Sequence, residues 1–257
     1  MNQLVPYIHP NAKIGNNVTI SPFSYIYEDV EIGDGTWIAS NVTIMNGARI
    51  GKNCRIFPGA VISAEPQDLK YKGEITTAEI GDNTVIRECV TIHKGTADRY
   101  KTVVGEGCLI MGYVHIAHDC IVGNHCIMAN YSALSGHCIV EDYAILEGFA
   151  GAQQFMRIGK HAFIGGGTYI RKNVPPFVKA AREPISYMGV NTIGLRRRGF
   201  DEAVIDNIQN IYRVLFQRGL NISQALEIIH KEFPETPELL DIINFIKTSD
   251  KGIISRG

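Results

Sequence analysis

The segment Tyr113-Val-His-Ile-Ala-His-Asp-Cys-Ile-Val-Gly123 places two histidines and an aspartate, His115, His118 and Asp119, within a few residues of one another. Histidine is the side chain whose charge changes nearest neutral pH. It therefore serves as a general acid or base, and it also binds metal ions. Whether these three side chains form a site depends on the elements that carry them.

Those elements are set by a repeat of six residues. An apolar residue recurs at every sixth position from Ile8 to Ile62, from Ile80 to Ile92 and from Val104 to Ile170. A second column, two residues earlier, holds small or β-branched side chains. A period of six fits neither an α-helix nor an alternating strand. It is typical of a parallel β-helix, in which each hexad is a short strand plus a turn and three hexads form one coil.

Residues eighteen positions apart should stack on adjacent coils, about 4.8 Å apart. His118, Gly136 and Gln154 have this spacing, so the repeat predicts that they stack in one row along the β-helix, which we call a file. His137 is expected to lie beside Gly136. The histidines lie outside both inward columns, which disfavours a role in the core. We interpret His115, His118 and His137 as a site. The surface histidines expected to be solvated are His9, His125 and His161.

Two segments interrupt the repeat, near residues 63–79 and 94–103, and the phase resumes after each. They are predicted to be inserted loops whose lengths are multiples of six residues, so that the phase of the repeat is kept. The first loop carries Asp68 and Lys70, whose spacing alone favours solvated side chains. We expect the β-helix to cover residues 1–190, including both loops.

From about Phe200 the apolar spacing becomes helical. A second helix is expected after an N-cap at Ser223. A third is expected at Thr236-Pro237, where an N-cap is followed by proline at the first helical position. Residues 191–257 are therefore predicted to form a helical domain.

Composition excludes several classes of protein. The net charge of −1 argues against a nucleic-acid-binding protein, and no apolar run reaches the roughly 18 residues that a membrane span needs. The amino-terminal residues lack the basic and apolar regions of a signal peptide, which predicts a cytoplasmic protein. Five of the six cysteines stand in the small inward column, so neither a disulfide framework nor a zinc-binding spacing is indicated.

Basic side chains gather in one part of the sequence. Residues 157–198 carry nine lysines and arginines against one acidic residue, Glu183. Such a patch on a nearly neutral protein indicates a phosphorylated ligand or an acidic protein partner. A solvated face is an alternative for the lysines, but it accounts less well for the run Arg196-Arg197-Arg198.

Several segments together match the pattern of one enzyme family. They are Gln67-Asp-Leu-Lys-Tyr-Lys-Gly-Glu74, Thr91-Ile-His-Lys-Gly-Thr96, His115-Ile-Ala-His-Asp-Cys120, Ser135-Gly-His137, Gln154-Phe155, and Gly189-Val-Asn191 through Leu195-Arg-Arg-Arg-Gly-Phe200. With the hexad repeat, they make nearly the whole chain resemble the UDP-N-acetylglucosamine O-acyltransferases of lipid A synthesis. The repeat alone is shared by many acyltransferases, whereas the inserted loop, the histidines and the arginine run are specific in combination.

The resemblance implies a left-handed parallel β-helix that assembles as a homotrimer with sites between subunits. The implied reaction transfers a 3-hydroxyacyl chain from acyl carrier protein to the 3-hydroxyl of UDP-N-acetylglucosamine, without a metal or a dissociable cofactor. A sugar hydroxyl needs a base at neutral pH. By resemblance that base is His118, oriented by Asp119, and the backbone N–H of Gly136 stabilises the oxyanion.

Further roles come from the same resemblance. The residues implied to bind the nucleotide and sugar are Asp68, Lys70, His115, His137, Gln153, Gln154, Asn191 and Arg197. The residues implied to contact the carrier protein are Lys172, Arg197 and Arg198. Gln153 and Ile193 stand where the best-known members have a histidine and a glutamate, which leaves the exact sugar open.

Rival interpretations remain open. The same fold acylates 3-amino sugar nucleotides in some relatives. Other hexad acyltransferases act on different acceptors or use a coenzyme A thioester. A carbonic-anhydrase-like β-helix would bind zinc through His93, His115 and His118. A scaffold without enzymatic activity would need no outward file of histidines.

The sequence Gly165-Gly-Gly167 interrupts a regular coil. A tight turn would account for Gly165 but less readily for Gly166. By resemblance, Gly166 closes the groove that holds the acyl chain. Since each buried methylene contributes roughly 0.8 kcal/mol, a few carbons more or less can decide the preference for a donor. The resemblance itself implies a long donor, of about fourteen or more carbons. The apolar residues that the strands point outward, expected to be covered in a trimer, are Val61, Val85, Tyr113, Ile121, Ile127 and Ile139.

Overall fold

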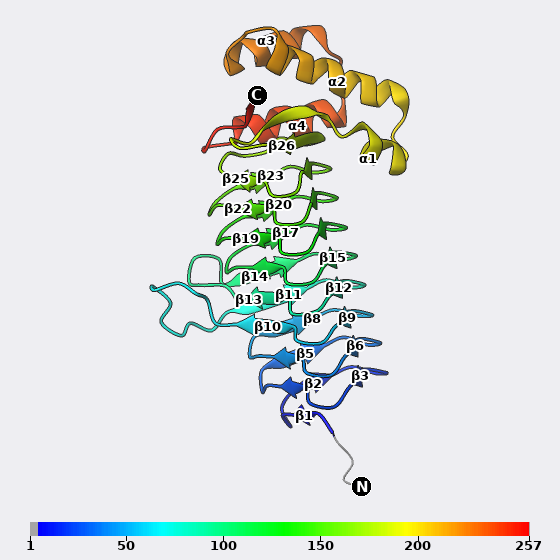
Figure 1. Ribbon diagram of the computed structural model, residues 1–257, viewed down its shortest axis with the longest axis vertical. Coiled ribbons are helices and arrows are strands. Elements are labelled where there is room, and N and C mark those ends of the chain that lie inside the picture. Colours follow the sequence, from blue (N-terminus) through cyan, green and yellow to red (C-terminus); the bar gives the residue numbers. More distant parts are fainter. Residues whose placement is uncertain (1–4, 257) are drawn as a thin grey trace.

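In the computed structural model, which describes residues 5–256, short parallel strands wind into a three-sided rod (Figure 1). One side consists of β1 (Tyr7–Ile8), β4 (Tyr25–Ile26), β7 (Thr43–Ile44), β10 (Val61–Ala64), β13 (Thr91–His93), β16 (His115–Ile116), β19 (Ala133–Leu134), β22 (Gly151–Ala152) and β25 (Tyr169–Ile170). The second consists of β2 (Lys13–Ile14), β5 (Val30–Ile32), β8 (Ala48–Ile50), β11 (Thr77–Ile80), β14 (Lys101–Val104), β17 (Ile121–Val122), β20 (Ile139–Val140) and β23 (Arg157–Ile158).

The third side is extended at its carboxyl-terminal end by an antiparallel hairpin. It consists of β3 (Thr19–Ile20), β6 (Trp37–Ile38), β9 (Arg55–Ile56), β12 (Val85–Ile86), β15 (Leu109–Ile110), β18 (Ile127–Met128), β21 (Ile145–Leu146), β24 (Phe163–Ile164), β26 (Val178–Ala181), β27 (Ser186–Val190) and β28 (Ser255–Arg256). From β1 to β25, every third strand along the chain therefore belongs to the same side of the rod.

The register between coils follows the predicted spacing. Ile116 pairs with Leu134, eighteen residues further along, and both side chains are fully buried in the interior. Across the two interruptions Ile50 pairs with Ile80, and Ile80 with Val104. Both offsets are larger than eighteen by whole hexads, as predicted for the inserted loops. The first loop projects from the rod beside β10 and β11 (Figure 1).

The corners of the coils have a left-handed backbone conformation. From Tyr113 to His161 every sixth residue, three positions after the apolar one, has a φ between 54° and 67°. None of these residues is glycine, although an L-residue pays roughly 1–2 kcal/mol for this conformation. Their rings stack from coil to coil, as in Tyr113, Tyr131 and Phe149, whose centroids lie 4.9 and 5.0 Å apart. Three ladders of outward side chains thus follow the edges of the rod.

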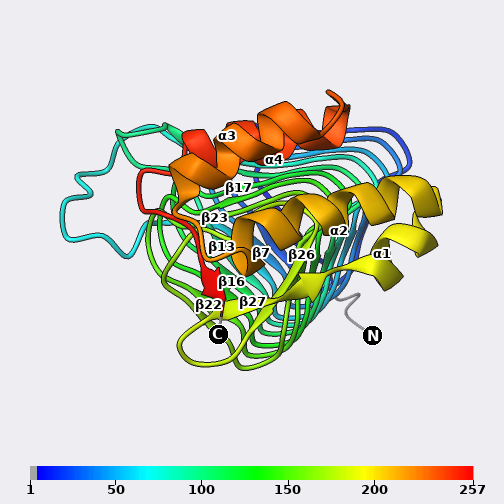
Figure 2. The ribbon, with the colours of Figure 1, turned by 90° about the horizontal axis from the view of Figure 1, so that it is seen from above.

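Helices cover the carboxyl-terminal end of the rod (Figures 1 and 2). They are α1 (Thr192–Arg197), α2 (Glu202–Gln217), α3 (Ile222–Glu232) and α4 (Pro237–Lys247). Thr236 caps α4 as predicted, but the N-cap of α3 is Asn221 and the prediction of Ser223 was wrong. Asn221 forms a capping box with Gln224, which places the start of the helix two residues earlier.

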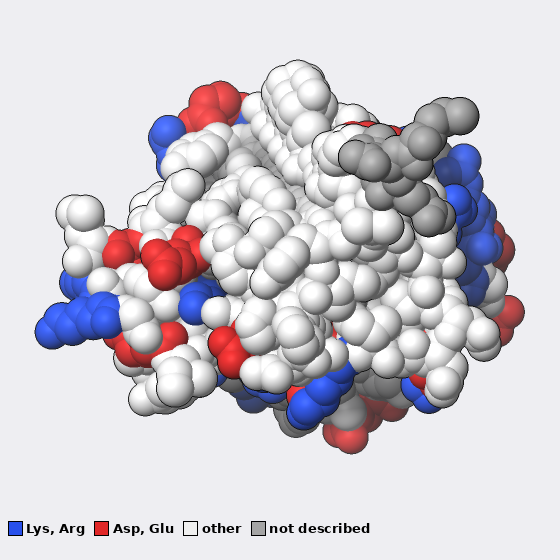
Figure 3. Space-filling model, turned by 90° about the horizontal axis from the view of Figure 1, so that it is seen from below, with Lys and Arg blue, Asp and Glu red and all other residues white. Residues whose placement is uncertain are grey.

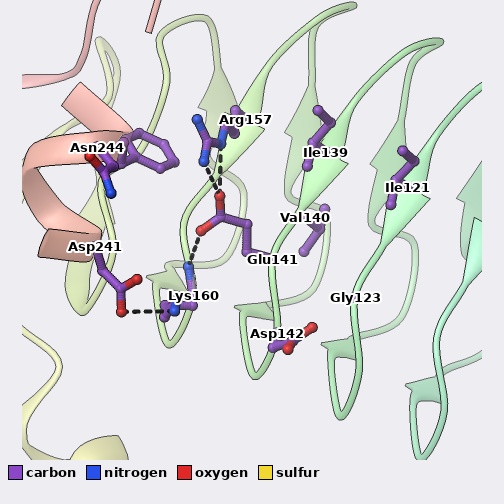
Figure 4. A pocket seen from close by; sticks show the side chains of 11 residues that line it. Ile121, Gly123, Ile139, Val140, Glu141, Asp142, Arg157, Lys160, Asp241 and Asn244 are labelled. Carbon is purple, nitrogen blue, oxygen red and sulfur yellow. Dashed lines mark hydrogen bonds and ion pairs between the residues drawn. The ribbon is translucent and has the colours of Figure 1, made fainter. Parts of the chain in front are cut away.

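An ion pair and a cation–π contact join α4 to the last coils, and Figure 4 shows the ion pair. Lys160 lies 2.7 Å from Asp241. Arg157 pairs with Glu141, and its guanidinium lies 4.3 Å from the ring centroid of Phe245. The hollow between α4 and strands β17, β20 and β23 is about 380 Å³ and contains none of the histidines.

At the amino-terminal end of the rod, charged side chains lie mainly around the rim (Figure 3). Tyr7 and Ile8 of the first strand are exposed there. Within residues 5–256, no helix has both the length and the apolar character needed to span a membrane.

Candidate active site

A hydrogen bond joins His118 and Asp119 at the corner that follows β16. His118 Nδ1 lies 2.8 Å from Asp119 Oδ2. Both residues are buried, with 4% of His118 and none of Asp119 exposed. Since a carboxylate accepts hydrogen bonds, Nδ1 carries the proton and Nε2 keeps its lone pair. The pair therefore presents a base on Nε2.

Asp119 stays ionised through a set of donors from the second inserted loop. Its Oδ1 accepts the backbone N–H groups of Thr96 and Arg99, at 3.0 and 3.1 Å. Its Oδ2 accepts the Thr96 hydroxyl at 2.6 Å. Burial raises the pKa of Asp119, but the hydrogen bonds from Thr96, His118 and Arg99 outweigh burial and hold that pKa below its ordinary value. The sequence contained no periodic signal for these partners, because the loop interrupts the repeat.

Gly136 lies directly against the His118 ring, as the spacing of eighteen predicts. A Cβ on Gly136 would stand 2.6 Å from Cε1 and 2.7 Å from Nε2 of His118. Any side chain at position 136 would displace the imidazole. Within the described residues the Gly136 N–H donates no hydrogen bond, so it is free to bind an anionic oxygen near His118. Gln154, the next member of the file, is exposed.

His137 lies on the coil after His118. The two rings meet edge to face, with centroids 5.1 Å apart, and His137 stacks on Phe155 at 4.6 Å. Asp98 Oδ2 lies 3.1 Å from His137 Nδ1, outside hydrogen-bond geometry, and Asp119 Oδ2 lies 3.9 Å from Nε2. The structure thus brings His137 into the same group as His118 and Asp119.

His93, which is buried, and His115, which is half-buried, form a second pair on neighbouring coils. Their centroids lie 4.8 Å apart, and His115 Nδ1 is 2.8 Å from the hydroxyl of Thr91. Burial, followed by the charge of His118, lowers the pKa of His115. Burial and the charges of His115 and His118 lower the pKa of His93 to about 4. Both histidines are therefore favoured in the neutral form.

A pocket of about 440 Å³ connects the two inserted loops with His137. Asp68 and Lys70 from the first loop, Asp98 from the second, and Phe155 line it together with His137. The loop that the spacing alone assigned to solvent thus contributes to the candidate site. Gln153 is exposed one residue before Gln154.

Four residues that the sequence assigned to substrate or carrier-protein binding have no hydrogen bond or ion pair with His118, Asp119 or His137 among the described residues. The side chain of Asn191 caps α1 through Gly194 N–H and donates to the carbonyl of His161. Arg198 donates to the carbonyl of Tyr143, and Lys172 to that of Lys251. Arg197 is exposed.

Gly166 lies at a turn near the end of the β-helix. A Cβ there would stand 3.2 Å from the carbonyl oxygen of Gly148, so a small shift would admit a side chain. The glycine with a left-handed conformation is Gly167, with φ of 66°, and it is not Gly165. Gly166 is exposed and its φ is not positive. The turn geometry therefore accounts for Gly167 and leaves the absence of a side chain at Gly166 unexplained.

The three histidines considered for zinc, His93, His115 and His118, do not have converging ligand atoms. Among the described residues the group that does is His118, Asp119 and His137, whose ligand atoms lie within 4.8 Å of one another. Both oxygens of Asp119 already accept hydrogen bonds from protein donors. Such a saturated carboxylate fits the orientation of an imidazole better than the binding of a metal.

His161 is buried, and the expectation of a solvated histidine there was wrong. Its ring stacks between Tyr143 and Phe177, with centroids 4.9 and 5.6 Å away, and Phe200 covers its edge. Its Nδ1 has no hydrogen-bond partner in the described structure. Burial and the charges of Arg198 and Lys160 lower the pKa of His161 to about 4.

Comparisons with known proteins agree on one family. A family model described as UDP N-acetylglucosamine O-acyltransferase, Domain 2, matches residues 173–254, and a model of bacterial transferase hexapeptide repeats matches residues 11–44, 29–64 and 101–136. The acyl-[acyl-carrier-protein]–UDP-N-acetylglucosamine O-acyltransferase of Chlorobium phaeobacteroides is 54% identical over 95% of this chain and 93% of its own. The enzyme of the same name from Aliivibrio fischeri MJ11 is 45% identical over 96% and 97%.

Solved structures give the same result. The UDP-N-acetylglucosamine acyltransferase of Bacteroides fragilis 9343 superposes with a TM-score of 0.96 at 50% identity, covering 99% of this chain and 100% of that one. Together with the repeat matches, this confirms the predicted left-handed parallel β-helix with a helical carboxyl-terminal region.

The buried His161 gives a prediction for the pH dependence of stability. Because its folded pKa of about 4 lies below the ordinary 6.5, its contribution to stability is complete above pH 6.5 and is lost as pH falls toward 4. His161→Phe places an aromatic ring that does not titrate at the same position. Between pH 7.5 and pH 4.5, the free energy of unfolding of wild type should therefore fall by about 2 kcal/mol more than that of His161→Phe.

Urea unfolding at both pH values measures this difference. His125→Phe, at the exposed end of the same stack, is the matched control. Parallel acid dependence of His161→Phe and wild type would contradict the assignment.

Proposed function

The chain belongs to the acyl-[acyl-carrier-protein]–UDP-N-acetylglucosamine O-acyltransferase family, and we propose that its reaction takes place at His118, Asp119 and Gly136. As in its relatives, an acyl group is transferred from acyl carrier protein to UDP-N-acetylglucosamine, the first step of lipid A synthesis. We further propose a 3-hydroxyacyl donor and the 3-hydroxyl of the sugar as acceptor. The observation that carries the site is the His118 ring, held by Asp119 on one side and lying against Gly136 on the other.

The geometry supports general base catalysis. Nε2 of His118 takes the proton of the sugar hydroxyl while Nδ1–H remains hydrogen-bonded to Asp119. The sugar oxygen attacks the thioester carbonyl, and the Gly136 N–H donates to the resulting oxyanion. The C–S bond then breaks, and the departing thiolate of the carrier takes the proton from His118. The new ester and the free thiol balance the reaction, and His118 is again neutral.

The pocket between the inserted loops suits the nucleotide and sugar. In this proposal Asp68, Lys70 and His137, which line it, bind UDP-N-acetylglucosamine. Lys70 is exposed and free to approach a phosphate, whereas an aspartate accepts hydrogen bonds from hydroxyl groups. His115, Gln153 and Gln154 are proposed to extend the binding surface along the same part of the rod.

Asn191 donates to the carbonyl of His161, and Arg198, the residue after Arg197, donates to that of Tyr143, so Asn191 and α1 lie at another corner of the rod. If Asn191 and Arg197 bind the same substrate, a second copy of the chain must bring them to the His118 corner. We therefore propose a homotrimer with sites between subunits. The exposed corner ring of Tyr113 and the outward Val61, Val85 and Ile127 remain candidates for the interface, whereas Ile121 and Ile139 line the hollow beside α4. Lys172, Arg197 and Arg198 are proposed to face the acidic carrier protein, although Lys172 and Arg198 also make internal hydrogen bonds.

His118→Ala tests the proposed base. Its turnover with UDP-N-acetylglucosamine and a hydroxyacyl carrier protein should fall by about 100-fold or more, because the hydroxyl loses its proton acceptor. The fold should persist, since the side chain lies outside the hydrophobic interior, and circular dichroism provides that control. Turnover close to wild type would rule out His118 as the base.

The assembly is tested by sedimentation equilibrium at micromolar concentration. We expect a species of three times the chain mass of 28.4 kDa, because isolated rods would expose apolar side chains on their outer faces. Substitution of Val85 by aspartate should shift the population toward monomers by burying an unpaired charge. A wild-type monomer would contradict the proposed trimer.

We propose that Gly166 sets the length of the acyl chain. The position is exposed and has room for a side chain after a small shift, so its substitution should leave the β-helix intact. A larger residue would fill the end of a groove and exclude the terminal methylenes of a long donor. Each excluded methylene removes roughly 0.8 kcal/mol of binding free energy.

A panel of 3-hydroxyacyl carrier proteins tests this role and the donor class together. Wild type should prefer donors of about fourteen or more carbons, and Gly166→Ala and Gly166→Met should shift the preference to progressively shorter chains. A wild-type preference for ten-carbon donors, or an unchanged profile in Gly166→Met, would exclude Gly166 as the determinant.

A further inference from the structure

In the structure the second inserted loop covers residues 94–100, between β13 and β14, and it lies against the buried carboxylate of Asp119. We propose that this loop is a positioning device for the reaction, and that the hydroxyl of Thr96 is the group through which it fixes Asp119 and, through Asp119, the His118 ring. The inference rests on the proposed role of His118 as the base. It assigns a function to a segment that the periodicity marked only as an interruption of the repeat.

The contacts between the loop and Asp119 are numerous and specific. Thr96 donates from its hydroxyl to Oδ2 at 2.6 Å and from its N–H to Oδ1 at 3.0 Å. Arg99 donates from its N–H to Oδ1 at 3.1 Å and from its guanidinium to the Asp119 carbonyl at 2.8 Å. On the other side, Asp119 N–H donates to the hydroxyl of Thr102 at 2.8 Å. These donors hold the ionised carboxylate in position and offset the cost of burying it.

The Thr96 hydroxyl has a fixed direction. Its oxygen accepts the N–H of Asp98 at 3.3 Å, so its proton is directed to Asp119 Oδ2. The same Oδ2 accepts the Nδ1–H of His118 at 2.8 Å. Thr96 and His118 therefore share one oxygen, and loss of the hydroxyl would let that oxygen move and become more basic.

The loop is built to hold this shape. Tyr100 N–H donates to the carbonyl of Thr96 at 2.8 Å and closes the turn. The carbonyl of Gly95 accepts the hydroxyl of Thr76 at 2.6 Å. A Cβ on Gly95 would overlap the backbone of Lys101, so the two ends of the loop meet at a distance that only glycine permits. A loop fixed in this way can transmit its geometry to Asp119.

A purely structural role is the alternative, since a buried carboxylate needs hydrogen-bond donors in any case. The two roles differ in what the removal of one hydroxyl changes. A structural donor affects the unfolding temperature alone. A positioning donor also affects turnover and its pH dependence, while the binding of the sugar nucleotide is largely unaffected.

Thr96→Val removes the hydroxyl and keeps the shape of the side chain. We expect kcat to fall about 10-fold, as for the loss of one hydrogen bond to a charged group, with KM for UDP-N-acetylglucosamine within about twofold of wild type. Thr96→Ser should restore kcat. If Thr96→Val does not fold, Thr96→Ala removes the same hydroxyl without adding a methyl group and gives the same comparison.

The pH profile provides a readout that a structural role would not move. The charged and titratable groups that face Asp119 are His118, His137 and Arg99, with Asp98 on the far side of His137. Without the Thr96 hydroxyl, Asp119 loses one of the hydrogen bonds that lower its pKa, so the carboxylate is more basic. The acid limb of kcat/KM should therefore move to higher pH in Thr96→Val and return in Thr96→Ser.

Thr84→Val is the matched control. The Thr84 hydroxyl is also buried and donates to the carbonyl of Gly105 at 2.8 Å, away from the histidines. This variant should lower the unfolding temperature and leave kcat and the pH profile unchanged. Wild-type kcat and pH profile in Thr96→Val, with His118→Ala inactive, would overturn the positioning role alone. Wild-type turnover in both Thr96→Val and His118→Ala would overturn the assignment of His118 as the base as well.

Discussion

The fold depends on a backbone constraint at the corners of the coil. From Tyr113 to His161 the chain turns after each short strand by placing one residue per hexad in the left-handed conformation, and that residue is never glycine. The unfavourable conformation is offset by pairing between coils and by stacking of the corner rings. Asp119 and His137 both occupy such corners. The reactive groups thus stand on the least adjustable backbone of the molecule, which limits their motion and favours a preorganised site.

Much of this architecture could be predicted because the repeat is redundant. The narrow interior admits one apolar and one small residue per hexad, so the phase of the strands follows from many positions at once. The same regularity predicted that Gly136 would lie beside His118. The structure confirms this, because a Cβ added to Gly136 would overlap the imidazole. The family indicated by the sequence is confirmed by relatives that match nearly the full chain.

What could not be predicted lies where the period is absent. The donors to Asp119 come from a loop with no repeat, so the periodicity gave no signal that Thr96 and Arg99 would contact Asp119. His161 was expected to be solvated because its position points outward, but Phe200 covers it from the helical region. Both Asn221 and Ser223 are residue types that cap helices. Asn221 is the N-cap of α3 because it forms reciprocal hydrogen bonds with Gln224. The roles of individual site residues remain proposals.

The direction of the hydrogen bonds between coils has a mechanical consequence. Bonds such as Tyr25 N–H to the carbonyl of Val42, at 2.9 Å, connect one coil to the next, and the coils are stacked along the length of the rod (Figure 1). Tension applied to the two ends would load the coils in series, so the rod would yield by the rupture of one layer at a time. His118 and His137 follow β16 and β19, which are internal strands of the nine-stranded side, and the helices cover the last coils at one end of the rod (Figure 1). Separation that peels inward from either end must pass through the terminal coils before it reaches the coils that carry His118 and His137.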